Sequence, residues 1–190
     1  AAAAQLARHY GLPCRALAGS TDAKTLDLQC MLERVSTLSP AALAGVHFLV
    51  CAGTLDGITV FSEPLLVLDD ELCGLALRLA RGIEVSEETI ALELIKQVGW
   101  QGHYLAEMHT AEHYRREHFL PRLLRREARE AWEQKGSKTA LELARERVRD
   151  LLAKHESRQL DPAVEKELLD YLAMVRQRSM DDYLAAEWDE

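Results

Sequence analysis

Two apolar segments in the first third of the chain have the pattern of buried strands. Residues 12–19 form a mainly apolar run that ends in small polar residues, where glycine and polar side chains break a strand. Residues 46–52 form a nearly continuous apolar run between Gly45 and Gly53, which is typical of a parallel strand covered on both faces. We therefore expect two parallel strands that lead into loops.

Most of the remaining chain repeats apolar residues with the period of an amphipathic helix. Ser86 is expected to cap one helix, with Val85 and Ile90 as a hydrophobic staple. A short third strand is expected at residues 102–105. The expected helices cover residues 26–37, a new start at Ser39 and Pro40, residues 70–81 capped by Asp69 or Asp70, and residues 86–99, 110–119, 139–155 and 162–176.

The order of these elements predicts an α/β fold. Strand, helix and strand in succession indicate βα units and a parallel sheet. Three strands would leave two bare edges on that sheet, which predicts that further strands lie outside this chain. A linker is expected at residues 133–138, which contain Gly136. The predicted organisation is therefore a βα part, residues 1–132, followed by a helical extension, residues 133–190.

Composition and charge narrow the class of function. The chain has 190 residues, 48% hydrophobic and 28% charged, with no apolar run long enough to suggest a membrane partner. Its net charge of −8 argues against a nucleic-acid partner, because phosphates repel an acidic surface. No two cysteines are closely spaced, which predicts reduced, mostly buried thiols in a cytoplasmic protein. They are Cys14, Cys30, Cys51 and Cys73.

A series of short motifs follows a set order along the chain, and this order makes chance similarity an unsatisfactory explanation. The motifs are Gly11-Leu12-Pro13, Thr21-Asp22-Ala23-Lys24 with Asp27 and Gln29, Ala42-Leu43-Ala44-Gly45, Gly57-Ile58-Thr59, Glu63, Leu68-Asp69-Asp70-Glu71, Arg81-Gly82-Ile83-Glu84-Val85, Gly102-His103-Tyr104-Leu105, His109-Thr110-Ala111-Glu112-His113 and Phe119-Leu120-Pro121-Arg122-Leu123-Leu124. Together they resemble the trimethylamine methyltransferase family.

The resemblance implies a fold and a reaction. Family members are (β/α)8 TIM barrels that move a methyl group from a methylated amine to the cobalt of a separate corrinoid protein. This chain would supply about the last three βα units and a helical tail. The partner protein would carry the corrinoid (cobalamin), with none bound tightly by this chain. An exposed barrel edge would favour pairing with another chain, so a homo-oligomer is also expected.

The resemblance also indicates a branch of the family. Archaeal trimethylamine enzymes carry pyrrolysine, whereas all 190 residues here are standard. The chain is therefore more similar to the pyrrolysine-free branch, which includes glycine betaine methyltransferases.

Active sites of such barrels lie at the carboxyl ends of the strands. A trimethylammonium group needs carboxylates and aromatic faces nearby, and we expect Asp22 and Glu63 to supply catalytic carboxylates. An N-cap or a salt bridge to Lys24 is the alternative for Asp22, and a surface loop position is the alternative for Glu63. The residues that the resemblance places around one mouth are Ser20, Thr21, Asp22, Thr54, Asp56 and His109. Of these, Thr21, Thr54 and Asp56 are expected to bind the substrate.

Aromatic and histidine side chains complete the expected amine site. Phe61, Trp100 and Tyr104 are candidates for an aromatic cage, with core or interface packing as the alternative. His103 is expected to contact the substrate. His109 is the third predicted catalytic residue, in contact with substrate or corrinoid, and helix capping or packing is its alternative.

Two other functions stay open at this point. His109 and His113 lie four residues apart on one helical face, a spacing that permits metal ligation and a metal-dependent hydrolase. Alternating charges at residues 142–149 and an acidic tail at residues 181–190 permit a non-enzymatic interaction module. Cys51 has no motif for a base beside it and is interpreted as an inert thiol.

Overall fold

A computed structural model describes residues 1–156, 160–180 and 182. The chain divides into two compact units, Ala1–Leu152 and Ala153–Glu190. The described part of the second unit contains α9 (Pro162–Arg176). The first unit contains α1 (Ala2–His9), β1 (Arg15–Leu17), α2 (Leu28–Leu43), β2 (Phe48–Val50), β3 (Thr54–Leu55), a 3-10 turn (Asp56–Ile58), β4 (Val60–Phe61), α3 (Glu63–Arg81), α4 (Glu87–Ile90), α5 (Leu92–Val98), α6 (Met108–Glu117), α7 (Arg129–Gln134) and α8 (Ala140–Ala153), which ends at the boundary.

The two predicted strands form a parallel pair. β1 pairs with β2 in the register Arg15 to Phe48, Ala16 to Leu49 and Leu17 to Val50. The helix α2 connects them, so the strand, helix and strand order predicted from the apolar pattern is confirmed. Each strand is three residues long, which is shorter than the apolar run that contains it.

A small antiparallel hairpin, which the apolar pattern did not predict, follows β2. β3 pairs with β4 in the register Thr54 to Phe61 and Leu55 to Val60. The connecting turn has positive φ at Asp56, Gly57 and Ile58. Four strand residues in two-residue pieces are too short to produce a recognisable alternation of apolar and polar side chains.

The helix α2 runs through Pro40, so the predicted break at Ser39 and Pro40 is wrong. Proline lacks an N–H and leaves the carbonyl of Ser36 without its helical partner. Both Ser36 and Pro40 lie on the exposed face, where water can satisfy that carbonyl. On the opposite face Leu38 and Ala41 are buried in a cluster with Ala18, which follows β1, and with α3, and this packing keeps the helix continuous.

The helix α3 begins earlier than expected, so the predicted cap at Asp69 or Asp70 is also wrong. Ser62 is the N-cap and its side chain accepts a hydrogen bond from the backbone N–H of Leu65. Pro64 occupies the first turn, where a missing N–H costs no helical hydrogen bond. Asp69 is buried within the helix and forms an ion pair with Arg34.

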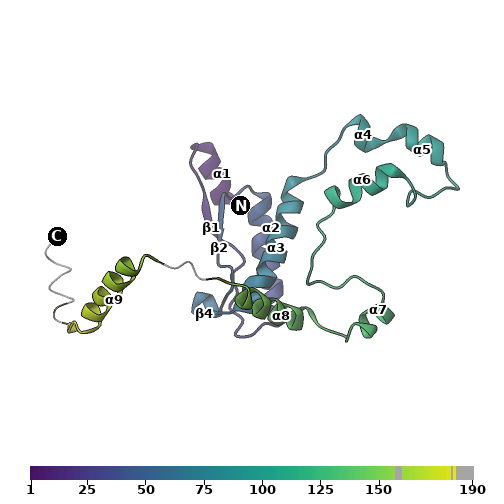
Figure 1. Ribbon diagram of the computed structural model, residues 1–190. Helices are drawn as coiled ribbons and strands as arrows, with labels where there is room; N and C mark the ends of the chain where they lie inside the picture. The colour runs from purple at the N-terminus through teal and green to yellow at the C-terminus, as the bar shows by residue number, and fades with distance from the viewer. Residues whose placement is uncertain (157–159, 181, 183–190) are drawn as a thin grey trace. The chain divides into compact units, whose positions relative to one another are not determined.

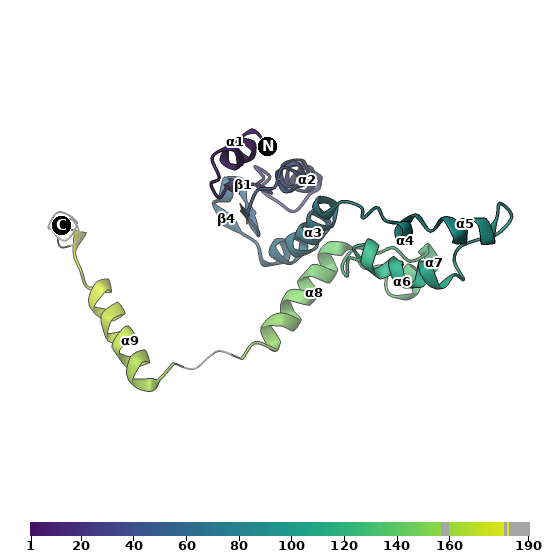
Figure 2. The same ribbon diagram turned by 90° about the horizontal axis from the view of Figure 1, so that it is seen from above.

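The core lies between the parallel strands and two helices. α2 and α3 run side by side in Figures 1 and 2. The residues buried in this layer are Ala18, Leu38, Ala41, Leu72 and Ala76. A second cluster contains Leu55 of the hairpin together with Ala23, Cys30 and Leu65. A third joins Leu68 of α3 to Leu123 and to Ala144, which belongs to α8. The apolar stripe expected on α3 is Leu72, Leu75, Ala76 and Leu79. Leu72 and Ala76 are buried, whereas Leu79 is 52% exposed.

The region after α3 differs from the prediction at three points. The helix that Ser86 caps stops at Ala91, whose φ of 51° is left-handed, and restarts as α5. Residues 102–105 are not a strand, because Gly102 folds back onto the end of α5, where an added Cβ would lie 2.4 Å from the carbonyl oxygen of Val98. The helix α6 starts at Met108, before the predicted cap Thr110.

The described chain is therefore α/β, mostly helical with two small sheets. The predicted helices α8 and α9 are present, and α9 has the predicted bounds Pro162–Arg176. Of the expected acidic tail, only Asp182 belongs to the described residues. Within the described ranges, no helix is long and apolar enough to cross a membrane.

Candidate strand-end site

Two loops meet where the parallel strands end. The first, residues 20–24, follows β1, and the second, residues 51–57, follows β2 and includes the two-residue strand β3. The backbone N–H of Asp56 donates to the carbonyl of Ala23 over 3.0 Å, and the N–H of Gly57 donates to the carbonyl of Thr21 over 3.0 Å. The structure therefore brings Thr21, Asp22 and Asp56 together, and Thr54 lies in the same second loop.

Glu33 of α2 holds the first loop. Its Oε2 accepts the hydroxyl of Thr21 over 2.7 Å and the N–H of Asp22 over 2.9 Å. Gln29 donates to the other carboxylate oxygen over 3.0 Å. The Thr21 hydroxyl, the Gln29 amide and the Asp22 N–H lower the pKa of Glu33, because they stabilise its ionised form. Thr21 itself is buried, so its role is to shape the loop.

Lys24 and Asp56 form an ion pair across the two loops. The Nζ of Lys24 lies 2.7 Å from Oδ1 of Asp56 and donates to the carbonyl of Asp22 over 2.8 Å. The hydrogen bond between the Lys24 ammonium and the Asp56 carboxylate lowers the pKa of Asp56 and raises the pKa of Lys24. Lys24 therefore pairs with Asp56 rather than with the side chain of Asp22.

Asp22 presents the available carboxylate of the pair of loops. It is exposed, and within residues 1–156, 160–180 and 182 its carboxylate accepts no hydrogen bond. Its Oδ1 lies close to the 3-10 turn, 3.7 Å from where a Cβ on Gly57 would stand. An available carboxylate beside a second carboxylate and a lysine gives this site a local charge that a cation can compensate.

A buried ion pair between Arg34 and Asp69 holds the second loop. The sequence did not single out Arg34, and it marked Asp69 only as a helix-cap candidate and as part of a motif. Arg34 Nε donates to Asp69 Oδ1 over 2.7 Å, and its two other nitrogens donate to the carbonyls of Thr54 and Cys51 over 2.9 and 3.0 Å. Asp69 Oδ2 also accepts the N–H of Gly53 over 2.6 Å. Burial raises the pKa of Asp69, and the hydrogen bonds from Arg34 and Gly53 oppose that rise.

Glu63, the second predicted carboxylate, lies on another surface. It is the first residue of α3, is exposed, and lines a shallow hollow with Pro64 and with Arg145, Val148 and Arg149 of α8. Among the hydrogen bonds that join the two strand-end loops, none involves Glu63 within the described residues.

The aromatic candidates are not brought together around the loops in the described part of the chain. Phe61 in β4 places its ring over Gly53, so that a Cβ there would lie 2.7 Å from the ring. Trp100 is 91% exposed, Tyr104 is 42% exposed, and His103 is also exposed. Of the three predicted aromatic cage residues, only Phe61 therefore contacts a strand-end loop.

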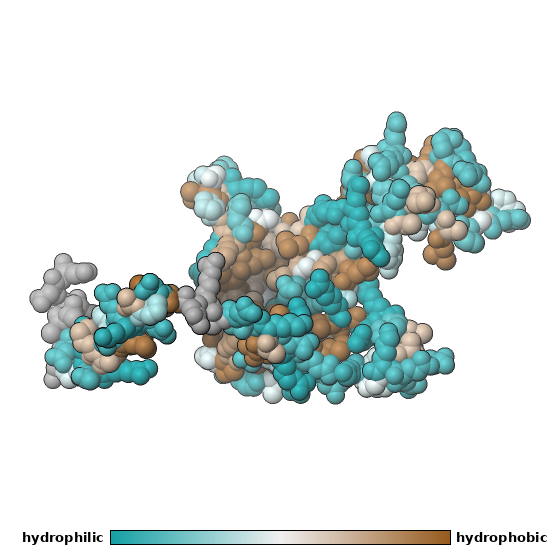
Figure 3. Space-filling model, viewed as in Figure 1, coloured by the Kyte–Doolittle hydropathy of each residue, from teal (hydrophilic) through white to brown (hydrophobic). Residues whose placement is uncertain are grey.

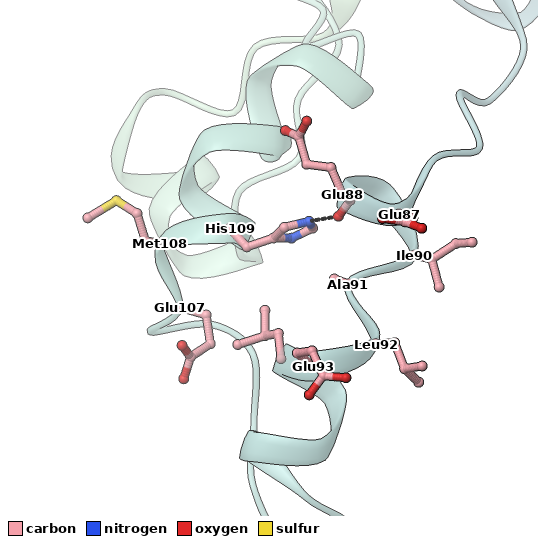
Figure 4. Close-up of a pocket in the computed structure, with 10 residues that line it drawn as sticks. Glu87, Glu88, Ile90, Ala91, Leu92, Glu93, Glu107, Met108 and His109 are labelled. Carbon is pink, nitrogen blue, oxygen red and sulfur yellow. Dashed lines mark hydrogen bonds between the residues drawn. The ribbon is translucent and has the colours of Figure 1, made fainter.

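The histidines contact α4 instead of the strand ends. Nε2 of His109 lies 2.9 Å from the carbonyl of Glu88, and Nε2 of His113 lies 3.3 Å from a carboxylate oxygen of the same residue. The two rings stack with centroids 4.2 Å apart. In Figure 4, His109 points toward the carbonyl of Glu88 in α4, and both residues line an open pocket of about 650 Å³ formed by α4, α5 and the start of α6.

A metal site on these histidines lacks ligands. Among the described residues, no group of three or more His, Cys, Asp or Glu side chains is placed to hold a metal ion. His109 and His113 have each other and Glu88 as neighbours, and zinc sites need three or four protein ligands. The geometry therefore gives no support to a metal-dependent hydrolase.

Comparison with known proteins gives one consistent result. A sequence profile described as "Trimethylamine methyltransferase (MTTB)" matches residues 1–181. The chain is 35% identical over 173 residues to a glycine betaine methyltransferase of Desulfitobacterium hafniense, covering 90% of this chain and 36% of that protein. It is 35% identical over 170 residues to the trimethylamine methyltransferase MttB of Methanosarcina barkeri, covering 88% of this chain and 34% of that protein. The chain thus spans about a third of the length of these relatives.

Proposed function

The chain belongs to the trimethylamine methyltransferase family, and we propose that it forms part of an enzyme that demethylates a tertiary or quaternary amine. The methyl group passes to the Co(I) corrinoid of a partner protein. The observation that carries this proposal is the pair of hydrogen-bonded loops at the carboxyl ends of β1 and β2. Barrel enzymes place their active sites at that end of the sheet.

We further propose that residues 1–132 are the last βα units of a (β/α)8 barrel and that residues 133–190 are a helical extension. Two features support a larger sheet. Leu17 of β1 and Phe48 of β2 are 63% and 62% exposed, and Figure 3 shows apolar side chains open to solvent over the strand region of the first unit. Three-residue strands in a two-stranded sheet need additional strands or helices to cover their apolar side chains.

The reaction needs charge placement more than proton transfer. For a quaternary substrate the N–CH3 bond breaks and nitrogen keeps the electron pair, so that the leaving amine is neutral and needs no general acid. The partner's corrinoid supplies the nucleophile in this in-line displacement. The chain's part is to hold the cationic nitrogen and aim its methyl group outward.

Asp22 is the side chain that we assign to the cationic nitrogen. Its carboxylate is exposed and accepts no hydrogen bond from the described residues, whereas Asp56 is engaged by Lys24. A carboxylate near a trimethylammonium group stabilises its charge without a directional hydrogen bond. Thr21, Thr54 and Asp56 then shape the two loops. A catalytic role for Glu63 or His109, a cage role for Phe61, Trp100 or Tyr104, and a substrate contact for His103 stay predictions.

A methyl-transfer assay tests this function. The methyltransferase that contains this chain is mixed with its reduced corrinoid protein and either trimethylamine or glycine betaine, and cobalt methylation is followed by absorbance. The variant Asp22→Asn removes one charge while keeping the shape of the side chain, and we expect kcat/KM to fall at least about tenfold. Asp70→Asn is the matched control, because Asp70 is an exposed aspartate on α3.

The outcomes separate clearly. Methyl transfer from neither amine, or only from mono- or dimethylamine, would overturn the proposed function. Transfer by wild-type protein with equal rates for Asp22→Asn and Asp70→Asn would keep the function and remove Asp22 from it.

A further inference from the structure

Arg34 is the largest fully buried side chain among the described residues, with 1% of its surface exposed. Its partner Asp69 is 3% exposed. Burying two charges carries a desolvation penalty of several kcal/mol per ion, and well-packed apolar residues often serve stability equally well. Stability alone therefore does not explain why this pair occupies the space between α2 and α3.

The contacts of the pair indicate what it does. The guanidinium of Arg34 reaches the carbonyls of Cys51 and Thr54, and the carboxylate of Asp69 reaches the N–H of Gly53. Three backbone groups within four consecutive residues are thus fixed by one ion pair. Planar guanidinium geometry allows this, because its donors point in fixed directions toward the carboxylate and both carbonyls at once.

The backbone that the pair holds is strained. Cys51 has a φ of 103°, and Gly53 also has positive φ. A residue with a side chain in such a conformation costs of order 1–3 kcal/mol and persists only where its surroundings fix it. The carbonyl of Cys51 accepts hydrogen bonds from Arg34 and from the hydroxyl of Thr54, at 3.0 and 2.8 Å. These bonds supply that constraint.

The held segment leads directly into the strand-end site. Thr54 opens β3, and two residues later the N–H of Asp56 bonds the loop that carries Asp22. A shift of the backbone at residues 51–54 would therefore move the carboxylate of Asp56 and the partner loop together.

We propose that Arg34 and Asp69 are a positioning pair for methyl transfer. They set the second loop, and through it the location of the Asp22 carboxylate relative to the methyl group of the amine. This inference rests on the proposed function, and it assigns neither residue a contact with the substrate. The ion pair then does more than pack α2 against α3. A substitution in it should change the position of the strand-end loops even where the stability of the fold is kept.

Two variants and a control test the proposal. Arg34→Lys keeps the charge facing Asp69, but a single ammonium cannot replace the fork that reaches both carbonyls. The double variant Arg34→Met with Asp69→Leu removes both charges and fills the space with apolar atoms, which often restores stability. Arg78→Lys is the control. Arg78 lies on α3, the helix that carries Asp69, but it pairs with Glu117 over 2.8 Å and its hydrogen bonds involve neither strand-end loop.

Two measurements are made at a temperature where circular dichroism shows each variant folded. Hydrogen exchange follows the amides of Asp56 and Gly57, which join the two loops. Methyl-transfer kinetics with the corrinoid protein give kcat and KM for the amine. We expect protection of both amides and kcat/KM to fall at least about tenfold in Arg34→Lys and in the double variant, while Arg78→Lys matches wild type.

Each result decides something. Wild-type kinetics and protection in the folded double variant, or in Arg34→Lys if the double variant does not fold, would overturn the positioning role. Loss of kcat/KM with the Asp56 and Gly57 amides still protected would also overturn it, because the loops would then be in place. Absence of methyl transfer by the wild-type protein would instead defeat the proposed function, and the amide exchange would still report whether the pair holds the loops.

Discussion

Gly74 of α3 packs against the ring of Phe119. Whether Gly74→Ala raises or lowers the free energy of unfolding should therefore depend on the presence of that ring. A Cβ added to Gly74 would lie 2.3 Å from Cε2 and Cζ of Phe119. Carbon atoms in contact prefer about 3.5–4.0 Å, so the ring would have to move by more than about 1 Å. Overpacking of this kind costs about 1–3 kcal/mol.

A helical glycine replaced by alanine otherwise gains about 1 kcal/mol, because alanine restricts the unfolded chain and favours the helix. With Phe119 present, the two effects leave Gly74→Ala destabilised by about 0–2 kcal/mol. In the Phe119→Ala background the overlap is gone, and the same substitution should stabilise the protein by about 1 kcal/mol. The expected coupling energy between the two positions is therefore about 1–3 kcal/mol.

Urea unfolding of wild type, both single variants and the double variant, followed by circular dichroism, gives all four free energies of unfolding. The slope of each transition should stay the same, so that the midpoints report stability. Stabilisation by Gly74→Ala in both backgrounds would refute the reasoning, because it would mean that the ring does not occupy the space beside Gly74.

Three further changes have expected outcomes. Leu65→Ala truncates a side chain that is 0% exposed and should lower the free energy of unfolding, measured in urea, by about 2–5 kcal/mol. Leu66→Ala truncates a neighbouring side chain that is 41% exposed and should lower it far less. Glu33 has a lowered pKa, so its ionised form stabilises the fold above the unfolded pKa of about 4.3 and this contribution is lost as pH falls through the folded pKa; Glu33→Gln should flatten the acid side of the stability profile. Ser86→Ala removes a capping box with Thr89 and should cost α4 about 0.5–2 kcal/mol, read from faster exchange of the Thr89 amide.

Each of these has a clear contrary result. Equal losses for Leu65→Ala and Leu66→Ala would place Leu65 outside the core. An unchanged acid limb in Glu33→Gln would mean that Thr21 and Asp22 do not depend on that carboxylate. Unchanged exchange of the Thr89 amide in Ser86→Ala would show that the cap does not hold α4.

Helices and strands with an extended apolar pattern were predicted well from the sequence, whereas the residues at which helices begin were not. The parallel strands follow from nearly continuous apolar runs, and α3 and α9 follow from helical periodicity that extends over many residues. The start of α3 was misplaced because Asp69 resembles an N-cap in sequence, while its buried partner Arg34 is 35 residues away. Pro40 was read as a helix start, although the packing of its helix overrides the local signal.

At the strand-end site, the sequence indicated the loop that carries the candidate residues, but not the side chains that hold this loop and its neighbour in place. The motif at residues 21–24 indicated the first loop, and the structure places it against the loop that contains Asp56. Glu33 and Arg34 lie inside α2, where charged residues are usually solvent-exposed, and nothing in their local sequence marks them. Asp69 carried only the signal of a helix cap and of a family motif, not of a buried ion pair. The hydrogen bond that Glu33 accepts from Thr21 and the ion pair of Arg34 with Asp69 depend on tertiary contacts that a single sequence does not display.

Glu33 and Arg34 are neighbours on α2, yet each holds a different loop. Consecutive helical residues are about 100° apart around the axis and 1.5 Å apart along it, so one rigid cylinder carries both attachments. Sliding or rocking of α2 would displace the Asp22 loop and the Asp56 loop in the same direction. The spacing of the Asp22 and Asp56 carboxylates therefore depends on one helix, and any change in the packing of α2 would move both of them together.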